Sequence, residues 1–172
     1  MDKCVYFTDR IFSSGRTDIY NESQEILGKL DLKSAFTSSV SVENQKGEII
    51  VEGSFPFLSG KWTIKQPNGK EFGEVRASFS FFTKRYSYTT NSGRFEIESP
   101  AFSKEYTILD GNKAAVATFK KVSGIFQAAA YELKNYSDFL LTEELIAVVM
   151  GVNAIEKRRS SSASGGGAGA ST

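Results

Sequence analysis

The stretch EELIAVVMGVNAIEKRR, from Glu143 to Arg159, is the most apolar part of the sequence. Between residues 145 and 155 it has no charged side chain, and Asn153 is its one strongly polar residue. Such a run is typical of a helix that is buried on every side. It is too short for a membrane span, which needs about 20 apolar residues, and it lacks the polar face of an interfacial helix. We therefore expect this helix to lie inside the protein.

The flanks of this run carry the signals of a helix start and a helix end. Thr142 can cap the first turn, and Glu143 and Glu144 suit the positive end of the helix dipole. The basic run 157–159 suits the negative end. The sequence therefore predicts a helix from Glu143 to about Glu156.

A short pattern recurs six times before this helix, and it predicts what surrounds the helix. Each copy has an apolar residue, usually followed by Ser or Thr, and then an alternating strand. The apolar anchors are Phe12, Phe36, Leu58, Phe82, Phe102 and Phe126. Turn sequences lie between the anchors: NESQE, NQKGE, PNGK, NSGR and DGNK. Because such turns supply the positive φ of tight hairpins, each unit is predicted to be a strand, a turn and a strand.

The count of these units predicts the architecture. A leading strand near Val5–Phe12, five hairpins and a last strand near Ile125–Leu133 give twelve strands in up-and-down order. Closure into a barrel removes the exposed edges of so long a meander. A barrel wider than about eight strands is not filled by its own side chains, so the apolar helix is expected to occupy the middle. The predicted fold is mainly β, with a closed twelve-stranded barrel over residues 1–159 and a disordered Ser/Gly/Ala-rich tail over 160–172.

Composition narrows the possible functions. The 172 residues carry a formal net charge of +1, include no histidine and contain one cysteine, Cys4. Without histidine the commonest general base and metal ligand are missing, so we expect no catalytic residues, no metal site and no cofactor. Near neutrality argues against nucleic-acid binding. The single thiol and the charged start MDKCVYFTDRIF, which is unlike a signal peptide, predict a cytoplasmic protein.

The sequence resembles the LURP-one-related family, within the superfamily of tubby C-terminal domains and phospholipid scramblases. The residues that carry the resemblance are the repeated F-[ST]-x-x-aromatic-x-[IV] units, the DGNK-AAVATFKKV hairpin and the end YELKNYSDFLLTEELIAVVMGVNAIEK. It covers about residues 5–157, and small bacterial members are the most similar. The resemblance implies a twelve-stranded barrel around a hydrophobic C-terminal helix.

The resemblance implies little about function. Tubby domains bind phosphoinositides as membrane-tethered adaptors, and scramblases are associated with anionic lipids and calcium. No segment here matches the phosphoinositide motif of the first or the acidic calcium segment of the second. No residue role is therefore carried over from either group.

One asymmetry of charge predicts a binding surface. The links between repeats all fall at one end of an up-and-down barrel, and a helix of about 21 Å that returns from the other end should emerge there. Basic side chains outnumber acidic ones at that end. The candidate anion-binding residues are Arg16, Lys61, Lys84, Arg85, Lys104, Lys120, Lys121, Lys157, Arg158 and Arg159. Ordinary solvated loop charge is the competing explanation.

The favoured hypothesis is a non-enzymatic module that binds anionic phospholipid headgroups, peripherally to a membrane, or another acidic partner. One alternative is a protein-interaction or structural module without a lipid role, which requires an exposed apolar patch. Another is an intracellular carrier of a small apolar ligand, which requires an apolar cavity beside the helix.

Overall fold

In the computed structural model, twelve strands and one long helix are described over residues 1–33, 39–78, 84–100, 103–126 and 128–164. A 3-10 turn, η1 (Asp9–Phe12), follows the first strand. The strands are β1 (Cys4–Thr8), β2 (Gly15–Tyr20), β3 (Ile26–Leu32), β4 (Val40–Asn44), β5 (Ile49–Ser54), β6 (Trp62–Lys65), β7 (Glu71–Ser78), β8 (Lys84–Thr90), β9 (Gly93–Ser99), β10 (Tyr106–Leu109), β11 (Ala115–Val122) and β12 (Ala130–Asn135). The helix is α1 (Thr142–Ser164).

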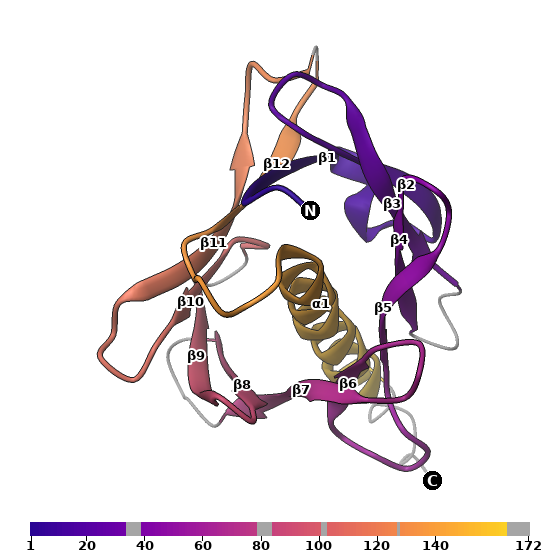
Figure 1. Cartoon of the computed structure of the whole chain (residues 1–172). Helices are drawn as coiled ribbons and strands as arrows, with labels where there is room; N and C mark the ends of the chain where they lie inside the picture. Colours follow the sequence, from indigo (N-terminus) through magenta and orange to yellow (C-terminus); the bar gives the residue numbers. More distant parts are fainter. Residues whose placement is uncertain (34–38, 79–83, 101–102, 127, 165–172) are drawn as a thin grey trace, which may run out of the picture.

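The strands form one closed antiparallel barrel in which each strand pairs with its neighbours in sequence (Figure 1). β1 closes the ring by pairing with β12, with Val5 opposite Leu133. The twelve-stranded up-and-down barrel predicted from the repeats is therefore confirmed.

The five tight turns form for the reasons that their sequences suggest. Gly47 has a φ of 79°, in the left-handed region that favours glycine. The Asn44 side-chain oxygen accepts hydrogen bonds from the backbone N–H groups of Lys46 and Glu48, at 2.9 and 3.1 Å. Asp110 does the same for the N–H groups of Asn112 and Ala114. These side chains replace backbone partners within the turn and so fix the hairpin geometry.

Helix α1 runs through the middle of the barrel, as Figure 1 shows, and packs against β4 to β7 and β12. The predicted burial of this helix inside the barrel is confirmed, since five side chains spaced along its apolar run are each no more than 5% exposed. These side chains are Leu145, Val148, Val149, Val152 and Ile155. The helix thus supplies the apolar volume that the wide barrel lacks.

The indole of Trp62, on β6, packs directly against α1 and is hydrogen-bonded to it. Its ring lies against the two glycines Gly53, on β5, and Gly151, on α1. A Cβ atom added to Gly151 would lie 2.4 Å from the indole Cδ1, so only glycine fits there. The indole N–H donates to the carbonyl oxygen of Ala147 at 3.1 Å. Close approach and a satisfied donor explain why a large aromatic residue faces a small one here.

Two expected strand boundaries and one expected anchor differ from the structure. The leading strand ends at Thr8, because the chain then turns into η1 and buries Ile11. The last strand begins at Ala130, after Gly124 with its φ of 92°. The anchor Leu58 is exposed, and the half-buried ring of Phe55 packs on Trp62 in its place. The anchors Phe36, Phe82 and Phe102 lie outside the described residues.

The helix also continues to Ser164, so the first five residues of the expected tail, 160–164, are helical. Serine hydroxyls in this last part of α1 form hydrogen bonds to the helix backbone. Those of Ser161 and Ser162 donate to the carbonyl oxygens of Lys157 and Arg158, at 2.8 and 2.9 Å. Between Gly151 and the glycine run that starts at Gly165, the sequence has no glycine or proline that would end the helix. Residues 157–162 are exposed, so this part of α1 lies at the protein surface.

Candidate functional site

The two ends of the barrel differ, and α1 connects them. We call the end with the five tight turns the hairpin pole, and the end with the links between repeats the link pole. β12 runs toward the hairpin pole, so α1 enters there and leaves at the link pole. The Lys157 amine donates to the carbonyl oxygen of Phe12, and the Arg158 guanidinium to that of Ser59, each at 3.2 Å. Since both acceptors lie in links between repeats, the basic end of the helix lies at the link pole.

Four cations of the predicted site, on strands or next to a strand, are paired with carboxylates that lie on strands. Each of these pairs is partly exposed, so it contributes little to stability but cancels local charge. The pairs are Arg16 with Asp31 and Glu43, Lys61 with Glu74, Arg85 with Glu96 and Glu98, and Lys120 with Glu132. The structure therefore does not bring these residues together as one free basic surface.

Three other predicted residues have different surroundings. The Lys104 ammonium lies 4.4 Å from the ring centroid of Phe12 and 3.5 Å from the Asn153 side-chain oxygen. Lys121 is exposed, and its backbone N–H donates to Glu105. Lys84 begins β8, but its side chain lies outside the described part of the chain.

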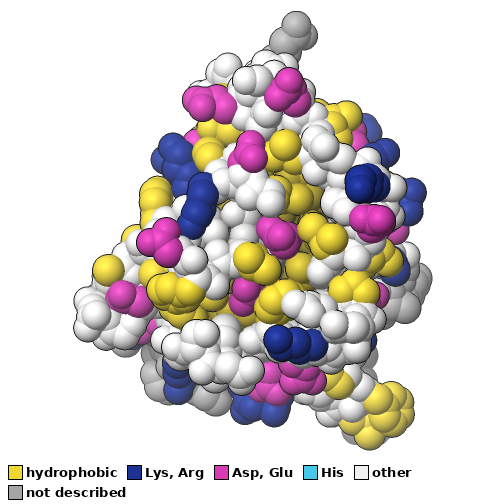
Figure 2. All heavy atoms as spheres, in the orientation of Figure 1, with side chains coloured by type: hydrophobic (Ala, Val, Ile, Leu, Met, Phe, Trp, Pro, Cys, Tyr) yellow, Lys and Arg dark blue, Asp and Glu magenta, His cyan; other side chains and the backbone are white. Residues whose placement is uncertain are grey.

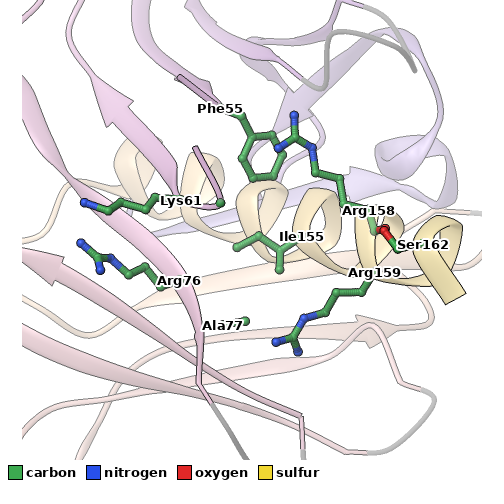
Figure 3. A pocket seen from close by; sticks show the side chains of 9 residues that line it. Phe55, Lys61, Arg76, Ala77, Ile155, Arg158, Arg159 and Ser162 are labelled. Atoms are coloured by element: carbon green, nitrogen blue, oxygen red, sulfur yellow. The ribbon is translucent and has the colours of Figure 1, made fainter. Parts of the chain in front are cut away.

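A cleft of about 500 Å³ lies beside the emerging helix (Figure 3). Its floor includes Ile155, and Figure 3 shows Arg158 and Arg159 along the helix side, with Lys61 and Arg76 along the strand side. We call it the basic cleft. Arg76 was not among the residues expected from sequence, because it lies within β7, away from the links.

On the strand side of the basic cleft, one carboxylate partly cancels the charge of two cations. Lys61 and Arg76 share the carboxylate of Glu74, at 3.3 and 2.8 Å. The hydrogen bond from Arg76, followed by that from Lys61, holds the pKa of Glu74 below its usual value, so this carboxylate stays charged.

Arg158 and Arg159 have no such counter-charge among the residues that the structure describes. The Arg158 guanidinium carbon lies 3.5 Å from the ring centroid of Phe55, and its hydrogen bond goes to a neutral carbonyl. No described carboxylate lies within 4.0 Å of either guanidinium. The cleft therefore has a formal surplus of three positive charges, two of which come from α1.

A second cleft, of about 420 Å³, shares Arg159 with the first and is lined also by Tyr86, Lys104, Glu156 and Lys157. The Tyr86 hydroxyl donates to Glu156 at 3.0 Å. Burial and the nearby Glu156 raise the pKa of Tyr86, so this hydroxyl stays protonated. The acidic side chain makes this cleft less suited to an anion than the basic cleft.

The hairpin pole has mixed charge, as Figure 2 shows from the end where α1 begins. Glu144 lies buried there, accepting hydrogen bonds from the Tyr88 hydroxyl and from the Leu141 N–H. Burial raises the pKa of Glu144 above its ordinary value of 4.5, against the opposing effect of the Tyr88 hydrogen bond.

This raised pKa predicts a pH effect on stability. The folded protein holds the Glu144 proton more tightly than the unfolded chain does, so stability from this group increases as pH falls from the raised pKa toward 4.5. Glu144→Gln keeps a hydrogen-bond acceptor but removes the titration. We expect the melting temperature of the wild type, relative to Glu144→Gln, to rise as pH is lowered from 7 toward 4.5. A difference that stays constant over this range would contradict the assignment.

Among the described residues, no helix has the length and apolarity needed to cross a membrane. The same residues hold no cluster of three or more Cys, Asp or Glu side chains that could bind a metal ion.

Comparisons with known proteins agree with this architecture. The X-ray structure of a protein from Arabidopsis thaliana superimposes with a TM-score of 0.59, at 10% identity, over 87% of this chain and 90% of that one. At that identity the likeness shows the fold alone. No curated protein matches the sequence. The family model described as LURP-one-related matches residues 5–139, more than half of the chain. This protein therefore belongs to the LURP-one-related family.

Proposed function

We propose that this protein is a non-enzymatic binding module whose basic cleft recognises a phosphate-bearing or otherwise anionic group, as in the headgroups of acidic phospholipids. One observation carries the proposal. Arg158 and Arg159 extend from the barrel into a cleft that has a surplus of positive charge and no described carboxylate within 4.0 Å of either guanidinium. Guanidinium groups match the geometry of phosphate oxygens.

The ion pairs described above narrow the predicted surface. Charges on Arg16, Arg85 and Lys120 are already satisfied by carboxylates, so they contribute little to the attraction of a partner. The helix-borne arginines are the residues on which binding is expected to depend. Near an anionic bilayer each basic residue contributes about 1 kcal/mol to binding.

Charge reversal tests this proposal. We expect Arg158→Glu/Arg159→Glu to weaken association with vesicles of phosphatidylcholine and phosphatidylserine by at least about tenfold, because two attractions become repulsions. Co-sedimentation at low and moderate salt measures the association, and the melting temperature reports the fold.

The matched control is Lys46→Glu/Lys70→Glu, which makes the same change in net charge at exposed positions of the hairpin pole. It should reduce binding far less than the arginine pair. Equal losses in the two variants would show that net charge alone acts, and would refute the basic cleft as the site.

The structure does not favour the carrier hypothesis, but it has the exposed apolar side chains that the protein-interaction hypothesis requires. The basic cleft and its neighbour open to solvent at the link pole, with charged side chains at their mouths, which does not favour a carrier of apolar ligands. The protein-interaction alternative requires exposed apolar side chains. These occur at both poles: Phe57 and Leu58 at the link pole, and Ile26, Tyr136, Phe139 and Leu141 at the hairpin pole.

A further inference from the structure

The link between β5 and β6 exposes two large apolar side chains beside the basic cleft. Phe57 is 92% exposed and Leu58 is 91% exposed, more than any other exposed large hydrophobic residue of the described chain. Figure 2 shows hydrophobic side chains on the projection at the lower right, where this link extends in Figure 1. Full exposure of two adjacent apolar residues is unfavourable in water, so it calls for a physical reason.

The backbone gives Leu58 no structural reason to be a leucine. The N–H of Ser59 donates to the carbonyl oxygen of Pro56 at 2.9 Å, which closes a four-residue turn with Phe57 and Leu58 at its tip. Leu58 has a φ of 55°, the left-handed conformation that a type II turn requires at its third residue and that favours glycine or asparagine. Folding alone would therefore favour a different residue at this position.

The base of this turn is held by the core and by α1. The Phe55 ring contacts Trp62 edge-on, with centroids 5.1 Å apart, and the Arg158 guanidinium carbon lies 3.5 Å from the Phe55 centroid. Arg158 also donates to the Ser59 carbonyl, and the Lys61 N–H donates to the Ser59 hydroxyl at 3.0 Å. The exposed tip thus projects from a fixed base, with the cationic side chains of the basic cleft beside that base.

We propose that the turn 56–59 is an apolar wedge that inserts into the interfacial region of an anionic lipid bilayer while the basic cleft contacts the headgroups. This inference rests on the proposed function and names the source of the anion as a membrane surface. A bilayer presents negative headgroups outside and hydrocarbon beneath them, and the wedge presents cations at its base and apolar side chains at its tip. A soluble phosphate compound would be bound by the cleft alone and would gain nothing from Phe57 or Leu58.

Removing the wedge is the first test. Phe57→Ser/Leu58→Asn keeps the turn, since asparagine tolerates positive φ, and leaves every cation in place. We expect association with vesicles of phosphatidylcholine and phosphatidylserine to weaken by about tenfold or more, given the apolar area withdrawn from water on insertion. The matched control Ile26→Ser/Phe139→Ser removes two exposed apolar side chains at the hairpin pole and should leave association unchanged.

Insertion itself gives the second readout. Trp62 is the single tryptophan and is buried against α1, so its fluorescence supplies a constant background. A Phe57→Trp variant retains the wedge and should shift to shorter wavelength on these vesicles, with quenching by lipids brominated on their acyl chains. Ile26→Trp, at the opposite pole, should show neither change.

A soluble polyanion separates the two proposals. The wild type and Phe57→Ser/Leu58→Asn should bind inositol hexakisphosphate equally, whereas Arg158→Glu/Arg159→Glu should lose both this ligand and the vesicles. If the wedge variant binds vesicles as tightly as the wild type, or Phe57→Trp is not quenched, the wedge is refuted and the basic cleft remains. Binding of the polyanion without binding of vesicles also refutes the wedge alone. If the wild type binds neither vesicles nor the polyanion, both proposals are overturned.

Discussion

Replacing Val149 by aspartate should leave the protein without a cooperatively folded state. Val149 is 1% exposed, in the part of α1 that fills the barrel. A carboxylate there would be buried among apolar side chains, and an unpartnered buried charge costs several kcal/mol. A domain of this kind is stable by about 5–15 kcal/mol in total, and no other described element fills the interior of the barrel. Circular dichroism and urea titration of the purified variant measure the outcome.

Val149→Thr is the matched control for this experiment. It has the same shape, and its hydroxyl can bond to a backbone carbonyl one turn earlier in the helix, so the loss should be about 1–3 kcal/mol. A soluble Val149→Asp variant with a cooperative melting transition close to that of Val149→Thr would show that α1 does not depend on its central side chains for its place in the barrel.

The second large effect is expected at Gly151, where the usual consequence of a substitution should be reversed. In an exposed helix interior, alanine stabilises relative to glycine by about 1 kcal/mol. Here the added Cβ would meet the Trp62 ring at 2.4 Å, and the ring has Gly53 behind it. We expect Gly151→Ala to destabilise by about 1–3 kcal/mol through overpacking, and Gly151→Leu to prevent folding.

Urea unfolding measures these changes, with Gly111→Ala as the control, because a Cβ there meets no atom within 4 Å. That control should change stability by less than about 0.5 kcal/mol. In a Trp62→Leu background the cost of Gly151→Ala should fall, which gives a coupling energy for the pair. A Gly151→Ala protein more stable than the wild type would show that the indole does not fix the distance between helix and wall.

Much of the fold was predictable from local chemistry. Asn44 with Gly47, and Asp110 with its neighbours, form hairpins through contacts within a few residues, so their sequences predict them directly. The apolar run of α1 predicts burial because no side of it is polar. Strand ends were less predictable: β1 stops at Thr8 because Ile11 is drawn into the core by a 3-10 turn, a tertiary effect without a local signal.

The sequence was enough to predict at which pole the basic end of α1 emerges, but not which cations there are free of carboxylate partners. The direction of β12 and the length of α1 are enough to place Arg158 at the link pole. Whether a cation is free depends on cross-strand register, which sets Arg16 opposite Asp31 and Arg85 opposite Glu98 and which small bulges alter. Leu58 was wrongly predicted to be an anchor of the repeat, because its position in the repeat matches that of Phe12. In the structure the turn directs its side chain into solvent. Pro56 and Gly60, which flank the tip, were the available sequence signal for that turn.

The closing pair of the barrel, β1 with β12, also constrains the order of events in folding. Each hairpin can form within about 1–10 μs from nearby residues, but the seam and the helix bring together segments from opposite ends of the described chain, which makes closure slow. During synthesis, at about 5–20 residues per second, the hairpins leave the ribosome seconds before the helix that must cover their inner faces. The nascent strands therefore expose their core side chains until α1 arrives, and exposed apolar surface of this kind is prone to aggregation.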